Sequence, residues 1–323
     1  MASQYGATSL AELDYFLLSH SDRIGALDFQ LSSSEYVARE SQHVEMEQLL
    51  NAAKLLEQRQ PLPAELERAL FGGTSMGGTR PKALIERGNK QFIAKFSLSS
   101  DTYDIVKAEY IAMRLAEKCG LKVAPVSLTS SMGRDVLLVE RFDRDVTESN
   151  CYRRHMLSAL SLMLLGSMEA RYASYLDFAD RVRQRFVDPE ASLHELFARL
   201  CFNILVGNTD DHARNHAAFW DGETLALTPA YDICPQPRAG GEVGQAMEIG
   251  GHRRNLSTVD NARSVCQHFM LSHDEATDLI NAQERIVRTE WEATCEEAKL
   301  PRGERERLWE GAVLNPFCFE DWR

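Results

Sequence analysis

The chain has 323 residues, of which 44% are hydrophobic and 26% are charged. This length and composition predict one large two-lobed unit or two domains with a core of ordinary size, and they exclude wholesale disorder. The formal net charge is −12 and no basic stripe is visible, which argues against direct nucleic-acid binding by this chain alone, because phosphate contacts require Lys and Arg.

The cysteines and the apolar segments indicate the compartment. The seven cysteines are odd in number and include no CxxC pair, which is typical of reduced thiols in a cytoplasmic protein. The first residues lack the cationic start and the apolar run of a signal peptide. No stretch approaches the roughly 18 apolar residues of a membrane span, so we expect no membrane partner.

The amino-terminal segment is expected to be mostly helical. Residues 1–66 contain helix-like stretches separated by a loop at residues 25–29. Apolar residues at helical intervals predict a helix over Ser41–Gln58. Pro61 and Pro63 then end that helix, because proline cannot continue it.

A glycine-rich segment, residues 72–78, precedes a predicted β-hairpin. The two strands are Lys82–Glu86 and Gln91–Phe96, in which apolar and polar residues alternate. Between them lies Gly88-Asn89, a pair of residues that favours a turn.

The middle of the chain combines a helix, a strand and a long helical stretch. A helix is expected over Ile105–Cys119, with a glycine directly after it as the usual stop. Asp135–Phe142 is expected to be a strand that leads into a connector. Cys151–Asn208 is nearly all helical in character, apart from a break near Asp188-Pro189.

A second hairpin and a helical tail complete the chain. Ala217–Trp220 and Thr224–Leu227 flank Asp221-Gly222, which is a strong local hairpin signal. Residues 274–309 are helical and charged. The order of elements predicts an α+β fold with a mixed β/α half, residues 1–138, and a mostly α-helical half, residues 139–323.

The segment NTDDHARN, residues 208–215, has the spacing of a protein-kinase catalytic loop. In such loops an Asp, here Asp210, accepts or orients the proton of the substrate hydroxyl, and an Asn five residues later, here Asn215, binds magnesium. Asp232 follows the second predicted hairpin, where kinases hold a second magnesium ligand. Two hard oxygen ligands together with phosphate oxygens suit magnesium.

The first half of the chain contains two further groups of a kinase active site, a lysine and a glutamate, in the order in which kinases carry them. Lys95 lies in an alternating strand and resembles the kinase lysine that contacts nucleotide phosphates. Glu109 lies on the next predicted helix, where the glutamate that pairs with this lysine is expected. Each residue is unremarkable alone, and their order relative to the glycine-rich segment and the later Asp and Asn residues gives them weight.

Two alternative chemistries have weaker support in the sequence. A P-loop needs Lys and then Ser or Thr after its second glycine, and neither register, from Gly72 or from Gly73, provides them. A zinc site of Asp210, His212 and His216 is conceivable, but no convincing remaining ligand is evident.

Together these motifs resemble the HipA family of bacterial serine/threonine kinases, which are toxins of type II toxin–antitoxin systems. The resemblance rests on the glycine-rich segment, IAKF, LLVERFDR, FNILVGNTDDHARNH and LTPAYDI, in that order, and runs from about residue 25 to beyond residue 260. It implies a protein-kinase-like two-lobed fold, ATP and Mg²⁺, and phosphorylation of a serine on a protein. Aminoacyl-tRNA synthetases are the best-known targets of the family.

By motif position, the resemblance implies Asp210 as the catalytic carboxylate and Asn215 and Asp232 as magnesium ligands. Ser75 matches a loop serine that some members autophosphorylate to inactivate themselves. The resemblance also implies a nucleotide site formed by Ser75, Gly77, Gly78, Lys82, Lys95, Glu109, Glu140, Phe142 and His212.

The resemblance implies partners as well. The usual partner is a small helix-turn-helix DNA-binding antitoxin, which would supply the positive charge that this chain lacks. Full-length family members usually carry a longer region before the segment at residues 25–29, so this chain resembles a short form. Some systems encode that region as a separate small N-lobe-like protein, which is a second expected partner. A small-molecule phosphotransferase and a nucleotide-binding co-repressor scaffold remain as alternative functions.

Overall fold

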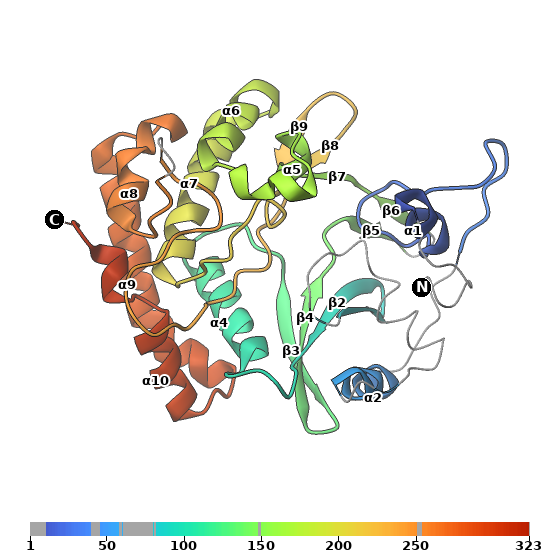
Figure 1. Cartoon of the computed structure of the whole chain (residues 1–323), viewed down its shortest axis with the longest axis horizontal. Coiled ribbons are helices and arrows are strands. Elements are labelled where there is room, and N and C mark those ends of the chain that lie inside the picture. Colours follow the sequence, from blue (N-terminus) through green and yellow to red (C-terminus); the bar gives the residue numbers. More distant parts are fainter. Residues whose placement is uncertain are drawn as a thin grey trace. The chain divides into compact units, whose positions relative to one another are not determined.

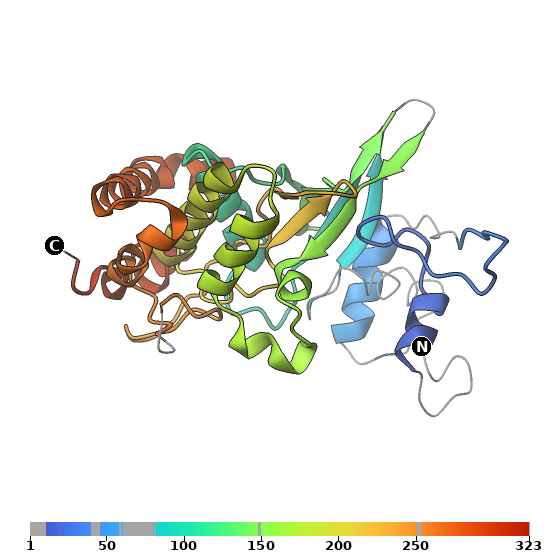
Figure 2. The same cartoon turned by 90° about the horizontal axis from the view of Figure 1, so that it is seen from above.

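The computed structural model describes residues 11–39, 46–57, 60, 80, 82–147, 150–250 and 254–322. The chain forms two compact units (Figures 1 and 2), and each unit takes two separate stretches of sequence. Unit 1 comprises Met1–Ser100 and Thr129–His155, and unit 2 comprises Asp101–Leu128 and Met156–Arg323. These units differ from the continuous halves divided at residue 138, and that division stays a prediction.

A four-stranded sheet contains the first predicted hairpin. Its order is β1-β2-β4-β3, with β1 at Lys82–Arg87, β2 at Lys90–Phe96, β3 at Val126–Ser131 and β4 at Arg134–Glu140. The hairpin β1–β2 confirms the prediction, and its Gly88 has a φ of +60°, which glycine adopts without steric cost. The strand β4 is confirmed too, whereas β3 was not predicted.

The helix α2 (Met46–Glu57) packs on one face of this sheet and confirms the described part of the predicted helix. Successive strand residues point to opposite faces. Ala83 and Ala94 lie on the face that α2 covers, so Lys82 and Lys95, one position away, lie on the other face. The core between helix and sheet consists of Leu49, Leu50, Ala52, Ala83, Ala94, Phe96, Val136 and Leu138.

The rest of unit 1 contains a short helix, α1 (Glu12–Leu18), and a two-stranded ribbon of β5 (Arg144–Val146) and β6 (Cys151–Arg153). The prediction of a mostly helical start is wrong for residues 19–39, which contain no helix. Several backbone polar groups of this segment, among them those of Ser21, Arg23 and Gly25, are hydrogen-bonded to distant side chains.

A buried ionic cluster provides several of those side chains. The carboxylate of Asp143 accepts hydrogen bonds from Arg141, from Arg144 and from the backbone amide of Gly25 at 2.7 Å. Both guanidinium groups also contact Asp22. Burial opposes ionisation of Asp143, but the hydrogen bonds and charges of the two arginines outweigh burial and hold its pKa below the ordinary value.

In unit 2, the helix α4 (Ile105–Lys118) packs against α9 (His273–Glu297), and α10 (Arg302–Gly311) follows at the end of α9. Asp104 caps α4 by accepting from the backbone amide of Lys107 at 3.1 Å. These three helices confirm their predictions. A charged helical tail is therefore tied to the middle of the chain by apolar packing.

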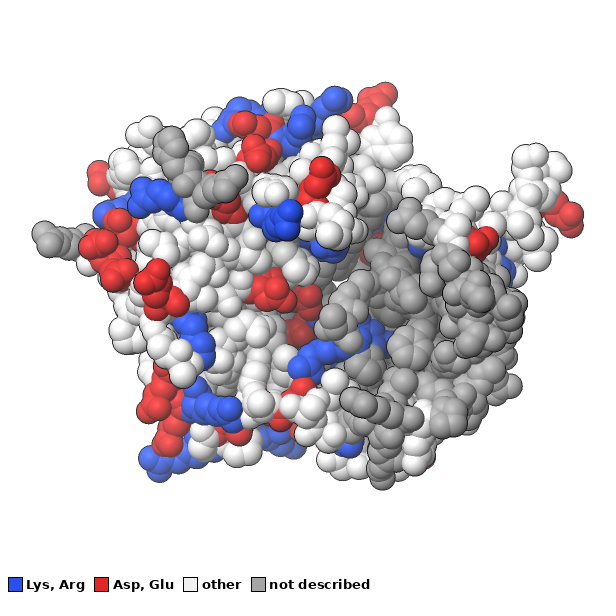
Figure 3. Space-filling model, in the orientation of Figure 1, with Lys and Arg blue, Asp and Glu red and all other residues white. Residues whose placement is uncertain are grey.

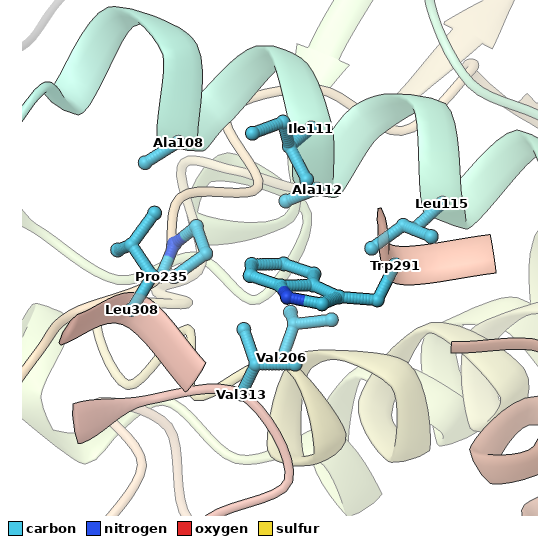
Figure 4. A pocket seen from close by; sticks show the side chains of 9 residues that line it. All are labelled: Ala108, Ile111, Ala112, Leu115, Val206, Pro235, Trp291, Leu308 and Val313. Atoms are coloured by element: carbon cyan, nitrogen blue, oxygen red, sulfur yellow. The ribbon is translucent and has the colours of Figure 1, made fainter. Parts of the chain in front are cut away.

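The centre of this packing is the indole ring of Trp291 on α9. Figure 4 shows the ring below α4, with Val206 and Val313 on its other side. Trp291 is 4% exposed, and the space around the ring has no room for a water molecule. The apolar side chains that line this space are Ala108, Ile111, Ala112, Leu115, Val206, Pro235, Leu308 and Val313.

The stretch predicted as helical from residue 151 begins with strands. Residues 151–158 form β6 and β7 (His155–Ser158), and β7 joins β8 (Ala217–Trp220) and β9 (Leu225–Leu227) in a three-stranded sheet. The helical prediction is wrong here because β6 pairs with the nearby β5 and β7 with the distant β8, and strand pairing overrides the local pattern. The hairpin β8–β9 confirms its prediction.

Helices follow from residue 159. The break near residue 188 is confirmed, because Asp188 caps the next helix and Pro189 is its first residue. The helices are α5 (Ala159–Leu162), η3 (Ser167–Tyr172), α6 (Tyr175–Arg185), α7 (Pro189–Leu205), α8 (Val259–Ser264), η4 (Cys266–Phe269) and η5 (Pro316–Phe319).

All seven cysteines are free thiols, as their odd number and the absence of a CxxC pair predicted. In the part of the chain that the structure describes, every helix is too short or too polar to cross a bilayer. On the face that Figure 3 shows, acidic and basic side chains of the described residues are intermixed.

Candidate active site

The predicted catalytic loop begins where α7 ends, in unit 2. Gly207 follows α7 with a φ of +68°, a left-handed conformation that suits glycine. Its carbonyl accepts from the backbone amide of Gln236 at 2.9 Å, and the carbonyl of Leu205 accepts from Leu314 at 2.7 Å. Two segments from later in the chain therefore fix the point at which the loop leaves the helix.

Asp210 and Asn215 meet within this loop. The side-chain amide of Asn215 donates to the backbone carbonyl of Asp210 at 3.3 Å, and its backbone amide donates to the carbonyl of His212 at 2.8 Å. Asp210 is exposed, and its carboxylate has no hydrogen bond or ion pair with the residues that the structure describes. The loop thus has an exposed carboxylate at Asp210 and a buried side-chain amide at Asn215.

Asp232 lies on the segment that follows β9. This segment is held to the loop because the hydroxyl of Tyr231 donates to the carbonyl of Arg214 at 2.7 Å. It is also held to the chain before β3, because the amide of Ala230 donates to Lys122 at 2.7 Å. Asp232 itself has a φ of +61°, which is uncommon for a residue other than glycine and recurs at functional sites.

A buried polar network lies beneath the loop, around Asp211. One carboxylate oxygen, Oδ2, accepts from the hydroxyl of Tyr175, from the amide of Asn203 at 2.8 Å and from Nε2 of His216 at 3.0 Å. The sequence did not predict Tyr175 or Asn203 as part of the site. The one available signal was Asn203 itself, a polar residue within the apolar run FNILV.

The network favours an ionised Asp211. Burial would raise the pKa of Asp211, but the charge and hydrogen bond of His216 and the hydrogen bond of Tyr175 outweigh burial and lower it. Burial and the neighbouring carboxylate raise the pKa of Tyr175 well above its ordinary value, so its hydroxyl stays protonated and can donate.

The two predicted lysines are cross-strand neighbours in unit 1. Lys82 on β1 pairs with Lys95 on β2 in the antiparallel register, so both side chains project from the same face of the sheet. Like charges at directly opposite positions destabilise a sheet unless an anion lies near them. The register thus places two positive charges side by side on this face of the sheet.

The other residues of the predicted nucleotide site lie on different elements. Glu140 ends β4 and pairs with Lys90, with 2.7 Å between Nζ and Oε2. Phe142 follows β4 and is half-buried, and Glu109 is buried on α4 in unit 2. The residues Ser75, Gly77 and Gly78 lie outside the described part of the chain.

The donor atoms of the loop fit magnesium better than zinc. The side-chain nitrogen of Asn215 donates to the Asp210 carbonyl, which leaves its Oδ1 available as an oxygen ligand of the kind that magnesium prefers. Zinc favours His and Cys ligands, with carboxylates as additional ones. His216 is bonded to Asp211, and the described residues contain no group of three His, Cys, Asp or Glu side chains that could hold a metal.

His212 is half-buried in the same loop. Its Nδ1 is buried and has no hydrogen-bond partner among the described residues. A buried nitrogen without a partner is costly, so a ligand that supplies a hydrogen bond here would be stabilised.

Known proteins match part of this chain. The putative kinase Y4mE of Sinorhizobium fredii is 32% identical over 134 residues, which span 39% of this chain and 31% of that protein. The serine/threonine-protein kinase toxin HipA of Shewanella oneidensis is 28% identical over 183 residues, which span 49% of this chain and 42% of that protein. The matches thus span less than half the length of either curated relative.

A solved structure shows the same fold over nearly the whole chain. It is the Shewanella oneidensis MR-1 toxin–antitoxin complex of HipA, HipB and operator DNA, which matches with a TM-score of 0.66 and 20% identity. The match covers 93% of this chain and 80% of that one, and it shows a protein-kinase-like α+β fold.

The sequence profile of the HipA-like C-terminal domain matches residues 74–298, which include the β1–β2 hairpin, the loop around Asp210 and Asp232. This range is well over half of the chain. The chain belongs to the family of HipA-like C-terminal domains, as its motifs predicted.

Proposed function

We propose that this chain is an ATP-dependent serine/threonine protein kinase and the toxin of a toxin–antitoxin system. The observation that carries the proposal is the loop in unit 2, where the exposed carboxylate of Asp210 lies beside an Asn215 that is folded back onto the Asp210 backbone. Kinases need this pair of groups on one loop, one for the attacking hydroxyl and one for the metal.

The proposed roles follow from the chemistry of each group. Asp210 accepts or orients the proton of the substrate hydroxyl, and Asn215 and Asp232 hold Mg²⁺. When bound, Mg²⁺ neutralises charge on the transferred phosphoryl group. Lys82 and Lys95 face the ATP phosphates. The remaining residues of the proposed nucleotide site are Ser75, Gly77, Gly78, Glu109, Glu140, Phe142 and His212.

The proposed substrate is a serine on a protein of the translation apparatus, such as an aminoacyl-tRNA synthetase, which places the activity in the cytoplasm. Support comes from the relative named as a serine/threonine-protein kinase toxin. The proposed partner is a basic helix-turn-helix antitoxin, alone or with a small N-lobe-like protein. Its support is the net charge of −12 and the presence of HipB and operator DNA in the matching structure.

Ser75 is proposed as the autophosphorylation site. A phosphate there would add about −1.5 to −2 charges to the glycine-rich segment that we propose binds the phosphates of ATP. The added repulsion would weaken ATP binding and so inactivate the kinase. Equal ATP affinity of the phosphorylated and unphosphorylated proteins would contradict this role.

The test of the proposed function is intact and peptide mass spectrometry after incubation with ATP and Mg²⁺, with and without a bacterial protein extract. Wild type should transfer phosphate to itself or to an extract protein, and Asp210→Ala should not. The matched control is Asp278→Ala, which removes an exposed carboxylate from α9 and should remain active. Failure of wild type to transfer phosphate to any protein would refute the kinase.

A further inference from the structure

Asp211, the neighbour of the proposed catalytic carboxylate, is a buried acid surrounded by hydrogen-bond donors. It is 2% exposed, and its Oδ2 receives donors from three different elements: Tyr175 on α6, Asn203 on α7 and His216 at the end of the loop. An oxygen that accepts three hydrogen bonds is best satisfied when it is a charged carboxylate.

The same network holds both ends of the loop. Asn203 donates to Asp211 and accepts, through Oδ1, from the side chain of Asn208 at 2.9 Å. Asn208 precedes Asp210, whereas His216 follows Asn215. A single carboxylate thus connects the start and the end of the loop to the two helices beneath it.

Burying the carboxylate of Asp211 costs free energy, which indicates that the network around it has a role beyond stability. Burying a charge is unfavourable, and well-packed apolar groups often replace buried ionic groups without loss of stability. A hydrogen-bonded charge does fix geometry, because each of its donors must keep its direction. The residue next in sequence, Asp210, is exposed and has a backbone carbonyl bonded to Asn215, so the direction of its side chain depends on how Asp211 is anchored.

We propose that Asp211 is the positioning residue of this loop: held by Tyr175, Asn203 and His216, it fixes the direction in which Asp210 presents its carboxylate to the substrate hydroxyl. This inference rests on the proposed kinase function. Asp211 does not itself touch the reacting atoms. Since a displacement of about 1 Å at a reacting group can cost about 100-fold in rate, loss of the anchor should act mainly on kcat.

The first variant is Asp211→Asn, which keeps the size of the side chain and removes its charge. We expect kcat for phosphate incorporation to fall about 100-fold, with the KM for ATP changed by less than about threefold. In the double variant Asp211→Asn with Asn203→Asp, the amide at 211 donates to the new carboxylate at 203, which also accepts from Asn208. This exchange restores the donor–acceptor pair between positions 203 and 211 and should recover about tenfold of the lost kcat, with the recovery incomplete because Tyr175 and His216 then face an amide.

A second pair of variants tests the inference even if Asp211→Asn fails to fold. Tyr175→Phe removes one donor and keeps the ring, so kcat should fall about fivefold, the equivalent of one hydrogen bond, with the KM for ATP unchanged. The matched control is Tyr110→Phe, which removes a partly buried hydroxyl that donates to another carboxylate, Glu297, away from the loop. Its kcat should equal that of wild type.

Amide hydrogen exchange separates this inference from the kinase proposal, because it does not depend on activity. In Asp211→Asn or Tyr175→Phe, peptides that cover residues 208–216 should exchange faster, with the rest of unit 2 unchanged. Unchanged exchange in this loop would overturn the inference, and so would a wild-type kcat in both variants. If wild type transfers no phosphate, the kinase proposal fails and the exchange result alone decides whether Asp211 anchors the loop.

Discussion

The α-carbon of Gly207 lies against the backbone of Ala312: a Cβ at position 207 would be 2.6 Å from the carbonyl oxygen of Ala312. Ala312 directly follows α10, near the carboxyl end of the chain, whereas Gly207 begins the loop that carries Asp210. The start of the proposed catalytic loop therefore lies against the backbone at the end of α10, and only glycine fits there.

Gly207→Ala should destabilise unit 2 for two reasons. The φ of +68° is strained for a residue with a Cβ, and the neighbour that must move is backbone. We expect a loss of at least about 2 kcal/mol in the free energy of unfolding, measured by urea denaturation. Gly303→Ala, on α10 in open space, is the control and should be neutral or stabilising. Equal stability of the two variants would contradict the steric argument.

The sequence predicted those elements whose signals are local. Turn residues at Gly88-Asn89 and Asp221-Gly222 marked both hairpins, and Asp188-Pro189 marked the start of α7. The strands β6 and β7 were missed, since their partners β5 and β8 determine their conformation. The bends of residues 19–39 were missed for a similar reason, because Arg141 and its neighbours, more than 100 positions away, bind that segment.

Prediction of the candidate site from the sequence was limited in the same way, to features with local signals. The sequence predicted that Asp210 and Asn215 share a loop, and the structure brings them together. It did not predict that Tyr175 and Asn203 anchor the loop, because a buried hydroxyl and a buried amide resemble any other helical residues until tertiary contacts are known. The roles of Asp210 and Asn215 in catalysis stay predictions that the proposed experiments test.

Asp232→Asn tests the magnesium site without disturbing the backbone. Asn tolerates the left-handed conformation of this position, so thermal stability should stay within about 0.5 kcal/mol of wild type. The loss of a charged oxygen ligand should raise the Mg²⁺ concentration for half-maximal phosphate transfer by about 100-fold. Asp278→Asn should leave this concentration unchanged. An unaltered Mg²⁺ requirement in Asp232→Asn would remove this residue from the proposed metal site.

The ionic cluster of unit 1 should make the free energy of unfolding depend on pH in the acidic range. Because the pKa of Asp143 is lower in the folded protein, its contribution is complete above the unfolded-state pKa of about 3.9 and is lost as the pH falls through the folded-state pKa. Asp143→Asn should therefore be about 3 kcal/mol less stable than wild type at pH 7, and the difference should shrink below about pH 4. Urea denaturation from pH 7 to pH 3 measures this difference.

The control for Asp143 is its close neighbour Asp145, which is exposed on β5. Asp145→Asn should match wild type at every pH, because the removed charge is solvated in both states. A constant difference between Asp143→Asn and wild type across the pH range would show that the cluster contributes by packing and not through ionisation of Asp143.

Trp291 should be the largest single apolar contribution to the junction of α4, α9 and α10. Trp291 is 4% exposed and apolar side chains lie around its ring (Figure 4), so Trp291→Ala should leave a cavity and cost about 3–5 kcal/mol in the free energy of unfolding. Trp220→Ala is the matched control, since that indole is 42% exposed on β8 and should cost less than about 1 kcal/mol. Denaturant unfolding followed by circular dichroism measures both variants. A similar loss in the two would mean that the tail helices are held by contacts other than this ring.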